Sequence, residues 1–175
     1  MSSAADQLSP RIYVACLAAY NAGCLHGAWI DIEDEETVKD AIEAMLTASP
    51  VAGAEEFAIH DYDGFGGVSI GEYEPIGRVV EIAGFLRERG QLGALVLEHL
   101  GGSIDDATAA LEDGYRGTFE SLADYFQELT EETTTIPEPL RPYIDYEAMA
   151  RDAELSGDVC ALRTAHDEMH VFWAR

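Results

Sequence analysis

The sequence predicts an α+β fold, because the spacing of its apolar residues changes twice along the chain. Residues 1–73 and 114–175 contain short apolar runs of strand length, whereas apolar residues recur at helical spacing through residues 74–113. Glycine is concentrated between residues 64 and 71, as is typical of a connecting loop. We therefore expect three small domains: an N-terminal α+β domain (1–73), a helical middle domain (74–113) and a C-terminal α+β domain (114–175).

In the N-terminal domain we expect one helix and three strands that form a short antiparallel sheet. Asp34 is a favourable N-cap residue, and apolar residues follow it every four positions from Val38 to Leu46, which predicts a helix over residues 35–47. A turn is expected at residues 21–23. The predicted strands are residues 11–17, 26–31 and 56–61.

Three helices are expected in the middle domain. Pro75 stands where a helix can begin, and the apolar stripe that follows it stops at Gly90. A second helix is expected over residues 91–100. Ser103 is expected to cap a third helix, which has two aspartates in its first turn, where the helix dipole stabilises them.

The C-terminal domain is expected to contain a strand, two helices and a final β-hairpin, with the three strands in one antiparallel sheet. A connector rich in threonine and proline, residues 133–142, separates the helices. The elements are the strand 115–119, a helix with the apolar face Leu122, Tyr125, Phe126 and Leu129, the helix 147–155, and the hairpin strands 159–164 and 169–173.

Acidic residues outnumber basic ones by 34 to 10, which gives the chain a formal net charge of −24. They run from Asp6 to Glu168 rather than forming a tail, so they predict a charged surface on a folded protein. Such a surface repels nucleic acid and anionic lipid, and it attracts basic proteins that bind nucleic acid. Adaptation to high salt is an alternative explanation, because salt-adapted proteins also have many acidic residues and few lysines. Lys39 is the one lysine in this sequence.

One acidic row is not explained by helix stability. Glu120, Asp124, Glu128 and Glu132 recur every four residues, and like charges at this spacing destabilise a helix by about 0.2–0.5 kcal/mol per pair. Four residues of helix rise about 6 Å, within a factor of two of the ~3.4 Å axial spacing of phosphates on one DNA strand. The row therefore favours a function for the charges themselves, and an ordinary solvated helix face is the alternative. A second dense patch lies around the start of the helix predicted at residues 35–47.

The cysteines and the apolar runs predict a cytoplasmic protein. Cys16, Cys24 and Cys160 are too few and too irregularly spaced for a disulfide framework or a zinc site, so we expect reduced thiols. The first ten residues lack the features of a signal peptide, and the longest apolar stretches are too short to span a bilayer. We expect no contact with membranes.

Two motifs suggest metal sites on first inspection. Asp61, Asp63 and Glu72 match positions 1, 3 and 12 of an EF-hand loop, but Phe65 occupies a position that normally supplies a ligand. A calcium-binding module remains an alternative. His166–His170 has metalloprotease spacing, but Asp167 stands where the glutamate is required and the segment is expected in a hairpin. We therefore expect no enzyme activity, no resident metal and no cofactor.

Several blocks of the sequence resemble the ArdA antirestriction proteins, in the order found in that family and over nearly the whole chain. The blocks are Ile12–Asn21, Leu25–Asp31, Ala54–Tyr62, Gly64–Gly67, Tyr143–Tyr146 and His170–Trp173. The resemblance implies an elongated, homodimeric mimic of B-DNA that occupies the DNA-binding groove of type I restriction–modification enzymes, on their methyltransferase core, and so protects incoming mobile DNA. It also implies that Leu122–Glu132 corresponds to a motif associated with antirestriction.

On this hypothesis the functional site is a set of exposed carboxylates, which we call the acidic surface. Its expected members are Asp31, Glu33, Asp34, Glu35, Glu36, Asp40, Glu43, Glu55, Glu56, Asp105, Asp106, Glu112, Asp113, Glu120, Asp124, Glu128, Glu131 and Glu132. The alternatives are a mimic of DNA aimed at another DNA-binding protein, such as a nucleoid protein, and a salt-adapted or calcium-binding domain without mimicry.

Overall fold

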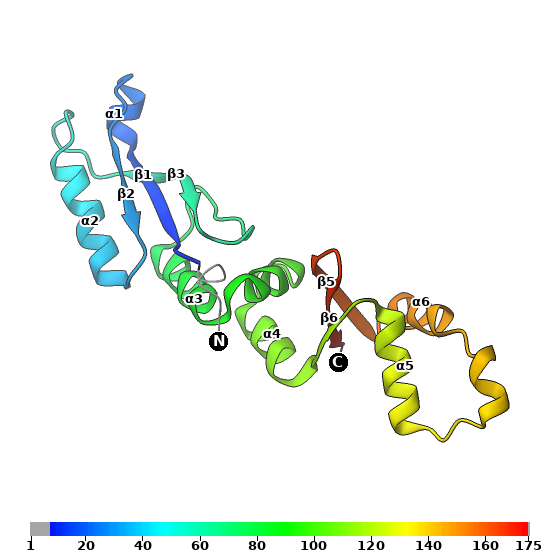
Figure 1. Ribbon diagram of the computed structural model, residues 1–175. Coiled ribbons are helices and arrows are strands. Elements are labelled where there is room, and N and C mark those ends of the chain that lie inside the picture. The colour runs from blue at the N-terminus through cyan, green and yellow to red at the C-terminus, as the bar shows by residue number, and fades with distance from the viewer. Residues whose placement is uncertain (1–7, 175) are drawn as a thin grey trace. The chain divides into compact units, whose positions relative to one another are not determined.

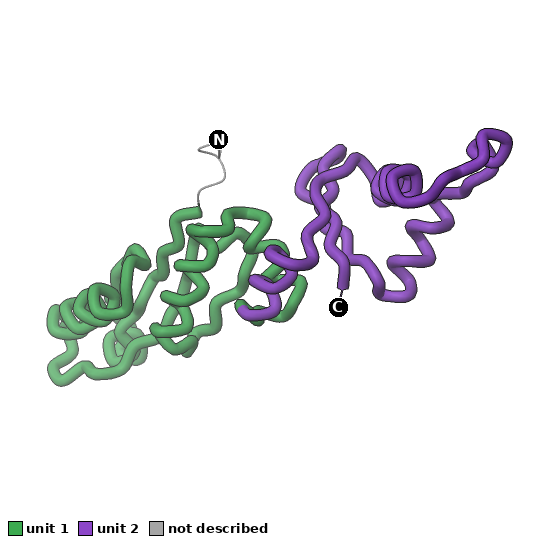
Figure 2. Tube along the Cα trace, turned by 90° about the horizontal axis from the view of Figure 1, so that it is seen from below, with its two compact units in different colours: residues 1–104 green, residues 105–175 purple. Residues whose placement is uncertain are grey.

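The computed structural model describes residues 8–174, which contain helices and two three-stranded antiparallel sheets (Figure 1). The predicted α+β class is therefore confirmed. The chain divides into two compact units, residues 1–104 and 105–175, each with a sheet of its own (Figure 2). The expected division into three domains is not confirmed and stays a prediction.

The first sheet has the strand order β2-β1-β3, and all three predicted strands of this region are present. Ile12 and Val14 of the central strand β1 are fully buried; Ile12 pairs with Ile30 on β2, and Val14 pairs with Ile59 on β3. A bulge interrupts the pairing of β1 with β3 next to Tyr13. The strands are β1 (Arg11–Cys16), β2 (Gly27–Asp31) and β3 (Phe57–Asp63).

Helix α2 (Glu35–Thr47) lies beside β1 and β2, as Figure 1 shows. Its bounds are those predicted from the sequence. Val38, Ile42 and Met45 are buried, because they recur at the three- and four-residue spacing that places side chains on one face of a helix. The acidic residues of α2 consequently remain on the opposite, exposed face.

The first strand ends one residue earlier than expected and is followed by a short helix that was not predicted, whereas the turn expected at residues 21–23 is present at Ala22 and Gly23. The strand ends at Cys16, and the next residues form a short helix, α1 (Leu17–Asn21). The Leu17 amide donates to the carbonyl oxygen of Glu56 at 3.0 Å, so the pairing of β1 with the segment of β3 continues for one residue into this helix. The alanines that follow favour a helical turn over a loop.

Helix α3 (Ile76–His99) begins directly after Pro75 and is interrupted at Gly90, which has φ 62° and ψ −155°. The prediction of two helices that meet at this glycine is thus confirmed. The side-chain amide of Gln91, just beyond the interruption, donates to the carbonyl oxygen of Gly66 at 3.0 Å. The glycine-rich loop is therefore held against α3. Helix α4 (Ile104–Ala109) follows Ser103 as expected.

The second sheet has the order β4-β6-β5, so the last strand of the chain lies in the middle. The predicted hairpin and its strand partner are confirmed. Two short turns were not predicted: a π-helical turn, η1, and a 3₁₀ turn, η2, within the expected connector. The elements are η1 (Ala110–Gly114), β4 (Tyr115–Phe119), α5 (Leu122–Thr133), η2 (Glu138–Tyr143), α6 (Tyr146–Ser156), β5 (Val159–Ala165) and β6 (Glu168–Trp173).

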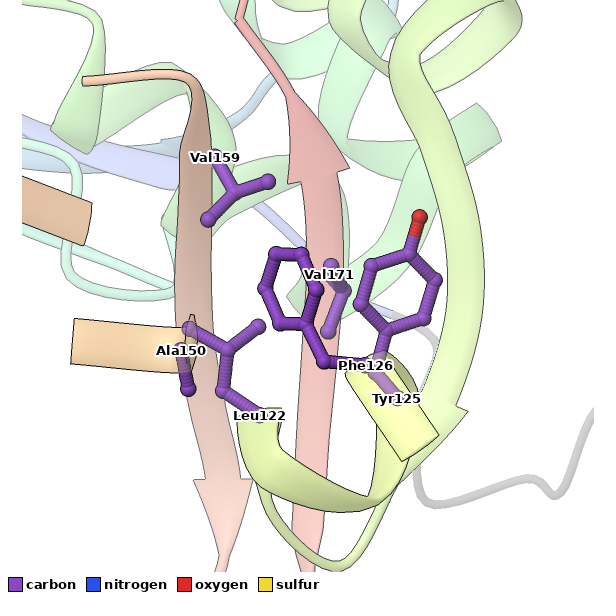
Figure 3. Packing of buried hydrophobic residues seen from close by; sticks show 6 residues of the cluster. All are labelled: Leu122, Tyr125, Phe126, Ala150, Val159 and Val171. Atoms are coloured by element: carbon purple, nitrogen blue, oxygen red, sulfur yellow. The ribbon is translucent and has the colours of Figure 1, made fainter. Parts of the chain in front are cut away.

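The core of the second unit joins α5 and α6 to the sheet (Figure 3). Val171 near the end of the chain belongs to this core and Trp173 packs against it, whereas Phe172 is buried on the other face of the sheet beside Tyr115. The indole of Trp173 also donates to the phenol oxygen of Tyr125. The buried cluster consists of Leu122, Tyr125, Phe126, Ala150, Val159 and Val171.

Candidate functional site

The carboxylates of this protein lie on its surface almost without exception. Every aspartate and glutamate from Asp31 to Glu168 is exposed except Glu74, which is half-buried. All members of the predicted acidic surface are therefore accessible to a partner. Burial of a charge is costly unless it is paired, and here the described cores are built from apolar side chains, together with the buried His170.

The negative charge is divided equally between the two compact units. Each unit contains 17 acidic and 5 basic residues, and so has a formal charge of −12, half of the −24 of the whole chain. Neither unit is a neutral scaffold for a charged neighbour. Both units consequently repel polyanions and attract basic surfaces.

The first part of the acidic surface surrounds α2. Glu36, Asp40 and Glu43 are spaced by four and three residues, which places them in one row on the exposed face of the helix. Glu35 and Glu36 lie in the first turn, where the helix dipole favours negative charge. Asp31 and Glu33 lie at the end of β2 and just after it.

Asp34 serves as the N-cap of α2, as its sequence position predicted. One carboxylate oxygen accepts from the backbone N–H of Thr37 at 2.9 Å, and the other accepts from the Thr37 hydroxyl at 2.9 Å. These bonds stabilise the ionised form, the backbone bond most strongly, and they lower the pKa of Asp34 below its ordinary value. Asp34 thus stabilises the helix while keeping a full negative charge at its start.

The second part of the acidic surface is carried by α5. Ser121 caps this helix by accepting from the Asp124 amide at 3.1 Å, and its hydroxyl donates to the Asp124 carboxylate at 2.6 Å. The helix therefore starts at Leu122, and Glu120 precedes the cap. The expected four-residue row thus has only Asp124, Glu128 and Glu132 on the helix, all of them exposed and opposite the buried face.

The remaining members of the acidic surface lie at element boundaries. Glu55 and Glu56 directly precede β3, and Asp105 and Asp106 occupy the first turn of α4. Glu112 and Asp113 lie in η1, next to β4. The structure places these pairs in short segments separated along the chain, so they extend the charged surface without forming a pocket.

Several carboxylates of the two units form ion pairs with exposed or half-buried basic side chains, which offset their negative charge only locally. Lys39 contacts Glu35 at 2.5 Å, and Arg141 contacts Glu131 at 3.9 Å, all through exposed side chains. Exposed pairs of this kind contribute about 0–1 kcal/mol and are screened by salt. Further pairs are Arg11 with Asp63, Arg78 with Glu81, Arg89 with Glu88 and Arg141 with Glu138.

The calcium-like motif does not fold as an EF-hand. Asp61 and Asp63 lie in strand β3, and Asp63 is paired with Arg11 at 3.0 Å. The side chain of Phe65 is buried, where an EF-hand loop would present a ligand. Within residues 8–174, no group of three or more His, Cys, Asp or Glu residues is placed to hold a metal ion.

The two histidines with metalloprotease spacing are separated by the hairpin. His166 lies in the exposed turn, whereas His170 is buried in β6. The ring of His170 contacts the Tyr115 hydroxyl through Nδ1 at 2.9 Å and the Glu168 carboxylate through Nε2 at 3.1 Å. These contacts give His170 a structural role between β4 and β6.

One further acidic group was not predicted from the sequence, although the structure presents it in the same manner. Asp145 caps α6 by accepting from the Ala148 amide at 2.9 Å, and Glu147, Asp152 and Glu154 are exposed along that helix. Their clustering within a predicted helix was the available signal. The acidic surface of the second unit therefore extends from α5 to α6.

Comparison with known proteins identifies the family. No helix in the described part of the chain is both long and apolar enough to cross a membrane. No curated protein matches the chain in a sequence comparison. A family model described as "Antirestriction protein (ArdA)" matches residues 12–168, which is nearly the whole chain. The protein with this evenly charged surface therefore belongs to the ArdA family of antirestriction proteins.

Proposed function

We propose that the protein mimics B-DNA and competitively occupies the DNA-binding groove of type I restriction–modification enzymes, on their methyltransferase core. Incoming mobile DNA would thereby be protected in the cytoplasm, where restriction takes place. The observation that carries the proposal is the exposure of the carboxylates in both units, each with a charge of −12. Membership of an antirestriction family supports it. The function requires binding alone and assigns no residue to catalysis.

The amount of charge fits a short DNA duplex. Duplex DNA carries one charge per about 1.7 Å of axis, so a charge of −24 corresponds to roughly 40 Å of duplex. A homodimer, which forms part of the proposal, would correspond to roughly 80 Å. These lengths correspond to roughly one turn of duplex for the single chain and roughly two turns for the dimer.

Charge repulsion within α5 also supports mimicry. Asp124, Glu128 and Glu132 are arranged so that each successive pair costs about 0.2–0.5 kcal/mol of helix stability. A row that weakens its own helix is expected where the charges serve recognition. The carboxylates would replace phosphates as partners of basic side chains in the groove.

Competition with target duplex for a purified type I methyltransferase tests the proposal. We expect the protein to displace the duplex at low salt and to lose affinity steeply as the salt concentration rises. Failure to displace DNA at low salt, with the protein shown to be folded by circular dichroism, would contradict the proposal. A protein that is merely salt-adapted would unfold under the same low-salt conditions.

A parallel competition distinguishes the proposed partner from the alternative, in which the protein mimics DNA to bind a different DNA-binding protein. A purified nucleoid protein replaces the methyltransferase, and the same duplex and salt series are used. Displacement from the methyltransferase at concentrations that leave the nucleoid protein bound to DNA supports the restriction enzyme as the partner. The reverse order of affinities would contradict it.

A further inference from the structure

The first sheet has an aromatic and charged face that shares only Asp31 with the acidic surface. Tyr13 pairs with Trp29 on one neighbouring strand and with Asp61 on the other. Arg11 pairs with Asp31 and Asp63 in the same way. Residues that are directly opposite in an antiparallel sheet share a face, so these six side chains lie together.

Two aromatic rings form the centre of this face. The ring centroids of Tyr13 and Trp29 are 5.7 Å apart, and the phenol of Tyr13 extends over Gly27. A Cβ at residue 27 would lie 2.5 Å from the backbone carbonyl oxygen of Val14 and 2.7 Å from the Tyr13 hydroxyl oxygen, so glycine allows both the backbone and the phenol to approach. Trp29 nevertheless keeps 45 % of its surface exposed. We call Tyr13 and Trp29, together with the carboxylates of Asp31, Asp61 and Asp63, the aromatic platform.

The chain's own Arg11 shows what this platform can bind. The guanidinium carbon of Arg11 lies 4.8 Å from the centre of the Trp29 ring, within the range of a cation–π interaction. Two of its nitrogens donate to one oxygen of Asp63, at 3.2 and 3.0 Å. The side chains of Arg11 and Asp63 are 47 % and 63 % exposed, so this arrangement is open to solvent.

We propose that the aromatic platform is a docking surface for arginine side chains of the partner's DNA-binding groove. This inference rests on the proposed function, because it takes the groove as the source of the arginines. The face offers an electron-rich ring and three carboxylates to an approaching cation, and among its six paired residues Arg11 is the one cation. An incoming guanidinium can contact Trp29 beside or in place of Arg11.

Guanidinium fits the platform better than ammonium does. A guanidinium is planar, is weakly hydrated and can stack on an aromatic ring while it donates to a carboxylate. An ammonium is a compact, strongly hydrated charge, so it gains less from the ring. The platform therefore adds a preference for arginine to a surface that otherwise attracts any cation.

The direct test uses hexa-arginine and hexalysine as probes of the isotope-labelled protein at about physiological ionic strength. We expect the indole N–H resonance of Trp29 to move with hexa-arginine more than with hexalysine. We also expect Trp29→Leu to weaken hexa-arginine binding about two- to five-fold and hexalysine binding by less. Tyr73→Leu is the control, because Tyr73 is 70 % exposed in the same unit and lies outside this face.

A second pair of variants tests the role of Arg11. Arg11→Gln frees the platform, whereas Arg151→Gln changes the net charge equally on helix α6. We expect Arg11→Gln to tighten hexa-arginine binding more than Arg151→Gln does. Trp29→Tyr, which keeps an aromatic ring, should retain most of the preference for hexa-arginine and covers the case in which Trp29→Leu fails to fold. The inference would be overturned if Trp29→Leu weakened the binding of hexa-arginine and hexalysine equally. It would also be overturned if Arg11→Gln and Arg151→Gln tightened hexa-arginine binding equally.

Competition on the methyltransferase separates this inference from the function on which it rests. Weaker displacement of duplex by Trp29→Leu than by wild type and Tyr73→Leu supports the platform as part of the interface. Displacement by wild type that Trp29→Leu does not weaken overturns the inference and leaves the proposed function standing. No displacement by wild type overturns the proposed function and the partner named here, even if hexa-arginine binds.

Discussion

The indole N–H of Trp173 donates to the phenol oxygen of Tyr125 at 2.5 Å, and this bond ties strand β6 to helix α5. The helix that carries the acidic row is thereby anchored to the centre of the second sheet. The buried face of α5 supplies Leu122, Tyr125 and Phe126 to the same core. The position of the row is consequently set by apolar packing on the opposite side of the helix.

Replacing Tyr125 with phenylalanine should destabilise the second unit. The ring stays in the core, but the Trp173 N–H loses its acceptor, for an expected cost of about 1 kcal/mol. Urea unfolding measures the loss. Tyr143→Phe is the matched control, because Tyr143 is 83 % exposed, and an equal loss in both variants would contradict the assigned role of the bond.

The stability that Asp34 confers should depend on pH. Its carboxylate has a lowered pKa in the folded protein, from an ordinary value of 3.8, because the Thr37 amide and hydroxyl donate to it. The contribution is therefore full above pH 4 or so and is lost as the pH falls through the lowered pKa. An asparagine in place of this aspartate can still cap the helix but does not titrate.

We therefore expect wild type to lose more stability than Asp34→Asn when the pH is lowered through the acidic range. Free energies of unfolding from urea titrations at a series of pH values measure this difference. Glu33→Gln controls for the removal of one nearby exposed carboxylate. A constant difference between wild type and Asp34→Asn across the series would exclude the proposed coupling.

Neutralising Glu128 should stabilise the protein while it weakens binding to the partner. Glu128 stands four residues from both Asp124 and Glu132 on α5, so Glu128→Gln removes two repulsions worth about 0.2–0.5 kcal/mol each. Thermal unfolding and duplex competition measure the two effects. Glu147→Gln is the control, since Glu147 stands four residues before Arg151 on α6 and its loss should bring no gain in stability.

Alanine at Gly66 should destabilise the first unit more than alanine at Gly23. Both glycines have positive φ, 63° and 79°, which costs an alanine about 1–2 kcal/mol. A Cβ on Gly66 would also lie 2.6 Å from the Cβ of Ala94 on α3, whereas nothing lies within 4 Å of a Cβ on Gly23. Overpacking adds about 1–3 kcal/mol. Equal losses in urea unfolding would show that the loop moves away from α3.

Features governed by neighbouring residues were predictable from the sequence. The cap at Asp34 depends on Thr37, three residues away, and the bounds of α2 followed from that local chemistry. The strands and the hairpin were equally visible as apolar runs. The placement of Glu120 in the helical row was wrong because spacing alone does not show that Ser121 forms the cap.

Features that depend on distant residues were not predictable. Arg11 and Asp63 are 52 positions apart, and only the pairing of three strands places them beside Trp29. The sequence pattern likewise does not reveal that the glycine loop packs on α3 through Gly66. The aromatic platform was therefore missed, although its residues lie within segments that were correctly assigned as strands.

The exposure of nearly every carboxylate has a consequence for how this sequence can diverge. Folding depends on one set of residues, the buried apolar ones, and recognition on another that seldom overlaps it. An acidic position can be exchanged between aspartate and glutamate, or moved by a turn of helix, without disturbing the interior. Relatives can therefore share charge density and fold while their individual acidic positions differ.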